Sequence, residues 1–160
     1  MGIEVHMDMR EIRAMLEREA QKHIQRTIAL LQYVGETVVN QIRTGQISNW
    51  IDRTGNLRSS IGYVITLDGQ PIETGGFKIV AGPERIEKGA GLVLNGASEG
   101  EEYARQLAMI YSKGIALIVV AGMEYASYVE KRDNKTVLAQ GEIEAEKLVT
   151  DMIRQLNSKR

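Results

Sequence analysis

The sequence predicts an α+β fold in which a long N-terminal helix and C-terminal helices pack on a small, mostly antiparallel β-sheet. Apolar residues recur at three- and four-residue spacing over residues 9–42, which is typical of one long helix. Short runs rich in β-branched residues follow between glycines and predict strands, and residues 142–156 again have helical periodicity. A chain of 160 residues has the size of one domain, so we expect a single domain over residues 1–160.

The first helix is expected to begin after Asp8, a good N-cap residue, with Glu11 three positions on completing a capping box. Its stripe covers roughly 34 residues, or about 50 Å of helix. The helix should end near Thr44 and Gly45, since glycine is the usual residue just past a helix end. The apolar stripe comprises Met9, Ile12, Leu16, Ala20, Ile24, Ile28, Leu31, Gly35, Val38 and Ile42.

The two halves of this helix differ in character. Over residues 9–25 the apolar seam is narrow and charged residues flank it, whereas from Ile28 onward the apolar face widens. We expect the second half to pack on the sheet and the first half to project and meet another subunit or protein, with Ile12, Leu16 and Arg18 as candidate contacts. A free, solvated helix end is the plainer alternative.

The middle of the chain predicts a helical turn at 55–60, capped by Thr54, and an antiparallel hairpin of strands 63–67 and 77–81. Residues 83–114 are interpreted as an insertion. Within it, Ser98 and Glu101 form a second capping-box pattern, which opens a helix expected over 99–112. The residues expected to face inward from that helix are Tyr103, Leu107, Ile110 and Tyr111.

The last third begins with seven apolar residues, 115–121, which predict a strand buried on both faces. Gly122 is expected to turn the chain into a short helix over 124–131. A brief edge strand at 136–138 and the C-terminal helix at 142–156 complete the expected order of elements.

Residue types that carry chemistry are scarce. The chain has no cysteine and only two histidines, His6 and His23, so we expect no metal site, no cofactor and no catalytic triad. The glycines of residues 89–96 match neither phosphate-loop pattern. One alternative is a small enzyme that uses the acidic residues of the 84–102 loop, which are Glu84, Glu87, Glu99, Glu101 and Glu102.

Charge and hydropathy narrow the range of partners. The 20 basic and 21 acidic residues are spread along the chain without a basic patch, so sequence-specific nucleic-acid binding is not expected. No apolar run approaches the ~20 residues needed to cross a bilayer, and no membrane contact is expected. Trp50, Arg53 and Arg58 remain candidates for contact with a partner, or with DNA if this is an accessory protein. Alternatively, Arg53 pairs with Asp52 and Arg58 is solvated.

Two motifs resemble the tail-completion, or head-to-tail joining, proteins of long-tailed bacteriophages. One is the Thr-Gly-x-Leu-Arg-x-Ser-Ile segment at residues 54–61, and the other is the Tyr-Ala-x-Tyr-Val-Glu segment at 125–130, which follows the late strand. The resemblance covers most of the chain in order. The chain departs from the family pattern at residues 131–137, where a Gly-Thr turn and a proline-containing stretch are common, and in the 83–114 insertion.

The resemblance implies a structural virion protein without an active site, from an active phage or a prophage. Such proteins assemble as a ring, typically a hexamer, at the end of the tail nearest the head, where they join tail-tube and head-connector proteins around the DNA channel. It also implies assembly in the host bacterial cytoplasm and a final place in the neck of the virion. The isolated chain is expected to be a ring or, before it meets its partners, a monomer.

Overall fold

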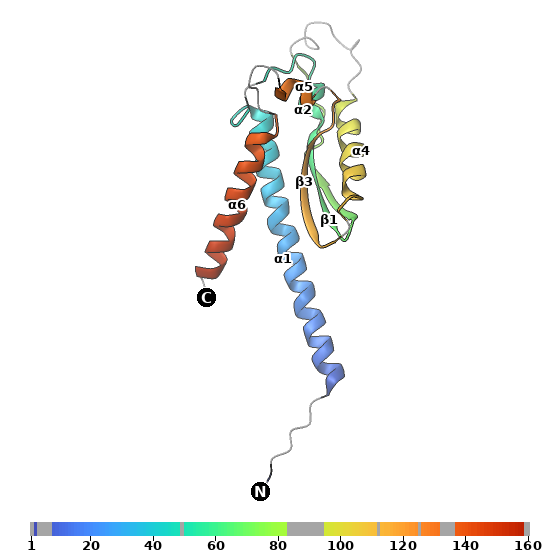
Figure 1. Cartoon of the computed structure of the whole chain (residues 1–160), viewed down its shortest axis with the longest axis vertical. Helices are drawn as coiled ribbons and strands as arrows, with labels where there is room; N and C mark the ends of the chain where they lie inside the picture. The colour runs from blue at the N-terminus through green and yellow to red at the C-terminus, as the bar shows by residue number, and fades with distance from the viewer. Residues whose placement is uncertain are drawn as a thin grey trace.

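The computed structural model describes residues 2, 8–48, 50–82, 95–111, 113–124, 126–131 and 137–158. Its elements, in chain order, are α1 (Met9–Thr44), α2 (Asn56–Ser59), β1 (Ile61–Leu67), β2 (Gln70–Gly75), α4 (Gly96–Ala108), β3 (Ile115–Ala121), α5 (Ala126–Lys131) and α6 (Ala139–Ser158). The sheet has the strand order β2-β1-β3 and both pairings are antiparallel. Helix α1 packs on one face with α6 beside it, and α4 covers the other face (Figure 1). The predicted α+β class is therefore confirmed.

Both ends of α1 are fixed by the residues that the sequence indicated. The Asp8 side chain accepts a hydrogen bond from the backbone N–H of Arg10 at 2.8 Å and so caps a donor that the helix itself cannot satisfy. Gly45 has a φ of 78°, and its N–H bonds back to the carbonyls of the last turn. The helix that results has 36 residues.

Two cores lie on the two faces of the sheet. The larger one joins α1, α6 and β1, and its buried members include Val34, Val38 and Ile42 of α1. The smaller one joins α4 to the other face through Ala104, Ala108 and the β3 residues Ile118 and Val120. The seven-residue strand β3 therefore has packed neighbours on both faces, although it lies at an edge of the sheet.

The predicted partner of the first strand was wrong. Strand β1 pairs with Gln70–Gly75 rather than with residues 77–81, because Asp68 and Gly69 have positive φ (50° and 78°) and make a tight two-residue hairpin turn. The backbone of residues 76–82 is bonded elsewhere. Arg43 of α1 donates to the carbonyls of Gly76 and Lys78, and the N–H of Val80 donates to Oγ of Ser59 at 2.8 Å.

Helix α4 begins three residues earlier than expected, ends four earlier, and buries mainly small residues. Ser98 does not cap it, since its hydroxyl donates to the carbonyl of Asn95, which is itself the N-cap residue. The buried residues are Gly96, Gly100, Ala104 and Ala108, and Leu107 packs against the smaller core as expected, whereas Tyr103, Ile110 and Tyr111 are exposed. Small residues face the sheet because α4 comes close to its backbone: a Cβ on Gly100 would lie 2.3 Å from the carbonyl oxygen of Ser60.

The remaining elements agree with the sequence in kind and differ in extent. Helix α5 begins at Ala126, and α6 begins at Ala139, three residues before its expected start. Residues 137 and 138 form a bend instead of the expected edge strand, and residue 136 lies outside the described residues. Residues 83–94 of the expected insertion also lie outside them, whereas α4 forms one of the three layers.

Candidate interaction surfaces

The N-terminal half of α1 extends well beyond the three-layered body of the protein (Figure 1). The first fully buried residue of the helix is Val34, and the first that packs against the larger core is Ile28. Before that point the seam is largely uncovered, with Met9 70% and Leu16 60% exposed, and the neighbouring Met15 is 52% exposed. The expectation that the second half packs on the sheet while the first half projects is confirmed.

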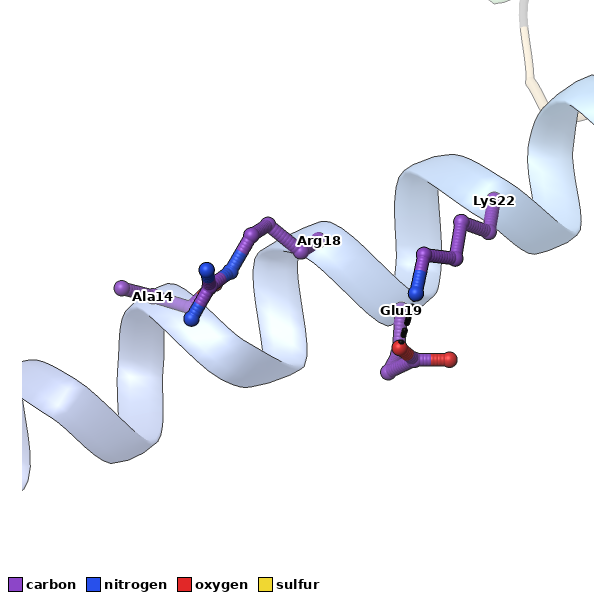
Figure 2. Close-up of polar contacts among 4 residues, drawn as sticks. All are labelled: Ala14, Arg18, Glu19 and Lys22. Carbon is purple, nitrogen blue, oxygen red and sulfur yellow. Dashed lines mark hydrogen bonds and ion pairs between the residues drawn. The ribbon is translucent and has the colours of Figure 1, made fainter.

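Polar contacts on this projecting half stay within the helix. Lys22 forms an ion pair with Glu19 at 2.7 Å, and Nε of Arg18 donates to the carbonyl oxygen of Ala14 at 3.2 Å (Figure 2). The hydrogen bond from Lys22 and its positive charge lower the pKa of Glu19. Exposed pairs of this kind contribute little to stability, and these contacts leave the apolar seam uncovered.

The six predicted contact residues fall into two groups far apart in the molecule. Ile12, Leu16 and Arg18 lie on the projecting half of α1, whereas Arg58 belongs to α2, near the opposite end (Figure 1). Trp50 is only 7% exposed, which places its indole in the core rather than on a partner surface. Arg53 is exposed.

Trp50 and Arg58 contact each other. The guanidinium carbon of Arg58 lies 5.6 Å from the centre of the Trp50 ring, a cation–π arrangement. Arg58 is half-buried, and its Nε and the Trp50 Nε1 are both buried without a hydrogen-bond partner. The alternative in which Arg58 is fully solvated is therefore wrong.

Asp52 makes backbone contacts that the sequence did not lead us to expect. Its Oδ1 accepts from the N–H of Gly55 at 2.9 Å, and its Oδ2 accepts from the N–H of Arg58 at 2.7 Å. One buried carboxylate thus satisfies two N–H groups at the start of α2. The short Asp-x-x-Gly spacing before the helical turn is the signal that could have revealed this cap.

The segment from Thr54 to Ile61 is a structural turn that leads into β1. Gly55 has a φ of 92°, and a Cβ there would lie 1.8 Å from the carbonyl oxygen of Val80. Ser59 and Ser60 are fully buried and donate to the carbonyls of Gly55 and Leu57 at 2.6 Å and 2.8 Å. Their hydroxyls are thus occupied by the local backbone.

The acidic residues of the enzyme alternative are only partly described. Glu101 lies on α4 and pairs with Arg105 at 2.7 Å, and Glu99 accepts a hydrogen bond from the Asn95 side chain. Glu84 and Glu87 lie outside the described residues. Within the described part of the chain, no three His, Cys, Asp or Glu side chains are grouped as the ligands of a metal ion would be.

No helix among the described residues combines the length and apolarity that a membrane span requires. No family model, curated protein or solved structure matches this chain.

Proposed function

We propose that this protein is a non-catalytic structural component of a phage or prophage virion, which joins the tail to the head connector by forming a ring with other copies of itself. Two observations support the proposal. The 54–61 and 125–130 segments resemble those of tail-completion proteins, and the projecting half of α1 carries an apolar seam that the other described residues leave uncovered. The seam is the observation that carries the assembly role.

A second copy of the chain is the partner that suits this seam. The projecting half carries both acidic and basic side chains beside the apolar stripe, including Arg18, Glu19 and Lys22, so two such helices can place opposite charges side by side. A ring forms when the seam of one copy lies against a different surface of the next copy, so that the contact is head-to-tail, and when the rotation per subunit divides a full turn. In the virion the neck would then be the site of action, and the cytoplasm of the host the site of assembly.

The test is the size of the full-length protein across a range of concentrations, measured by sedimentation velocity. Leu16→Glu places a charge on the seam and is expected to weaken self-association at least tenfold. Gln25→Glu is the matched control, because it adds the same charge on the opposite side of the same helix and should leave the association unchanged. Equal association of the two variants and the unmodified chain contradicts the proposed seam.

The joining role has its own test. The purified chain should co-sediment with tail tubes or head connectors from the same phage or prophage, and Leu16→Glu should retain its fold while it fails to assemble. Failure to bind either component refutes the joining function even if the chain forms rings. A mobility shift of DNA at low salt would favour the accessory DNA-binding alternative instead.

A further inference from the structure

Strand β3 leaves one edge of the sheet open. It pairs with β1 on one side, and no strand among the described residues pairs with it on the other. The carbonyl of Gly114 accepts a hydrogen bond from the N–H of Asp68, and the N–H of Gly122 donates to the carbonyl of Ser60. In an antiparallel pair, every second residue bonds to the neighbouring strand, so these two bonds show which residues of β3 face β1. By that alternation the even-numbered residues of β3 bond to β1, so Leu117 and Val119 direct their N–H and C=O groups outward.

The two edges of this sheet are built differently. The outer strand on the far side, β2, contains Pro71 and Glu73 and has a register irregularity opposite it, between Ile65 and Thr66. Proline, charge and bulges are the usual means by which proteins prevent a sheet edge from pairing with another chain. The β3 sequence, Ile-Ala-Leu-Ile-Val-Val-Ala, has no proline and no charge. The open edge at β3 is therefore unprotected.

A groove runs beside this edge, between β3 and the first turns of α6. It has a volume of about 530 Å³ and is lined by Leu117 and Val119 of β3 and by Ala145 of α6, with Glu142 and Glu146 on the α6 side. The β3 side chains that line it are only partly buried. A strand added to the β3 edge would place every second side chain in this groove, where apolar residues would cover Leu117 and Val119.

The chain contains a segment with the required pattern. Residues 3–7 read Ile-Glu-Val-His-Met, in which apolar Ile3, Val5 and Met7 alternate with polar residues. If the apolar three enter the groove, Glu4 and His6 lie on the opposite face of the sheet, away from the acidic α6 side. Residues 3–7 are called the arm below.

The arm cannot reach the β3 edge of its own chain. Six residues before Met9, Ile3 lies within about 22 Å of the start of α1 even when the chain is fully extended. The first α1 residue that packs against the core, Ile28, lies 19 positions after Met9, or about 28 Å along the helix axis. The projecting half of α1, which extends away from the sheet, is therefore longer than this reach (Figure 1).

We propose that the arm of one copy adds as a fourth strand to the β3 edge of the next copy, with Ile3, Val5 and Met7 in the groove between β3 and α6. Backbone hydrogen bonds to Leu117 and Val119 supply the pairing, and the groove selects the apolar face of the arm. Because the arm and the β3 edge are different surfaces, this contact is head-to-tail and leaves an arm and an edge free for further copies. The inference concerns how copies bind one another and does not depend on a role in a phage tail.

The absence of cysteine makes a cross-linking test clean. Two full-length single-cysteine variants, Val5→Cys and Val119→Cys, are prepared with different masses, mixed, and treated with a short bis-maleimide. The expected product is the mixed dimer of the two. A predominant product between two Val119→Cys chains would instead mean that β3 edges pair with each other, and it would overturn the proposal.

Controls separate specific docking from random encounter. Lys147→Cys replaces Val119→Cys at an exposed position on α6, and equal cross-linking to Val5→Cys there contradicts the proposal. No mixed product at the highest concentration attained also contradicts it. In sedimentation, Val5→Asp is expected to weaken association at least tenfold and His6→Asp to leave it within twofold. If Leu16→Glu weakens association and neither arm test does, the seam of α1 stands and the arm docking is refuted.

Discussion

The apolar stripe of α1 packs in the core over its second half and is largely uncovered over its first half. The same substitution made once in each half separates these two environments. Ile12 and Ile42 lie on the same apolar stripe of the same helix, but Ile42 is 1% exposed in the larger core, whereas Ile12 is only partly covered on the projecting half. Ile42→Ala removes a fully buried side chain and leaves a cavity. We expect it to lower the free energy of unfolding by about 2–5 kcal/mol.

The same change at Ile12 should cost less than about 0.5 kcal/mol, because little apolar area leaves water there on folding. The higher helix propensity of alanine offsets part of that small loss. For a chain of this size, a loss of about 3 kcal/mol lowers the melting temperature by roughly 6–12 °C. Ile12→Ala should therefore have the same melting temperature as the unmodified chain.

Thermal unfolding followed by circular dichroism measures both variants, at a dilution where sedimentation shows single copies. A second-site change sharpens the test: a Cβ on Gly141 of α6 would lie 2.8 Å from Cδ1 of Ile42, so Gly141→Ala should recover part of the stability lost in Ile42→Ala. Equal destabilisation by Ile12→Ala and Ile42→Ala would refute the reasoning, because it would mean that the N-terminal half of α1 is packed in the single chain.

Three further predictions concern the body of the protein. Asp52→Ala removes both hydrogen bonds that cap the α2 turn and should lower the free energy of unfolding by about 1–2 kcal/mol. Asp52→Asn should lower it less, because the amide oxygen still accepts one of the two bonds. Equal losses in the two variants would argue against the cap. Gly55→Ala should reduce the yield of folded protein far more than the neighbouring Thr54→Ala, because its Cβ would overlap the carbonyl of Val80; soluble, equally stable protein would contradict this. Burial raises the pKa of Tyr63, and so does the hydrogen bond that it donates to Glu36 at 3.0 Å. The neutral phenol therefore stabilises the fold fully at a pH below the pKa of an unfolded tyrosine, about 10. This contribution to the free energy of unfolding is lost as the pH rises above that value, because the unfolded chain ionises first. Denaturant titration at several pH values should show a smaller alkaline loss in Tyr63→Phe than in the unmodified chain, and identical pH profiles would contradict the assignment.

The candidate surfaces were partly predictable. Helical periodicity and the change in charge density after Gln25 were enough to indicate that the first half of α1 projects, because both are local properties of the sequence. The burial of Trp50 was not predictable in the same way. An aromatic residue in a loop can lie on either side of the surface, and here Trp50 packs in the larger core, with Arg58 brought over its ring by the α2 turn.

The pairing of strand β1 was also only partly predictable from the sequence. The Asp68-Gly69 pair is a strong local signal for a two-residue hairpin, which would make Gln70–Gly75 the partner strand. The residues at 77–81, however, have the higher β-propensity, so the sequence favoured them over this polar segment. Arg43 and Ser59 resolve this competition by bonding to the backbone of residues 76–80 from other elements. Contacts between residues 20 or more positions apart have no trace in a local pattern.

By itself, the sequence determined the fold class, the two ends of α1 and the β3 strand, because caps, glycine conformation and apolar periodicity act within a few residues. Only the tertiary structure decided which strand pairs with β1, that α4 faces the sheet with glycine and alanine, and that no described strand pairs with the outer edge of β3, beside a groove. These features depend on how closely distant segments approach one another. In α4, the backbone contact at Gly100 selects small residues for the buried face, which leaves the larger Tyr103 exposed.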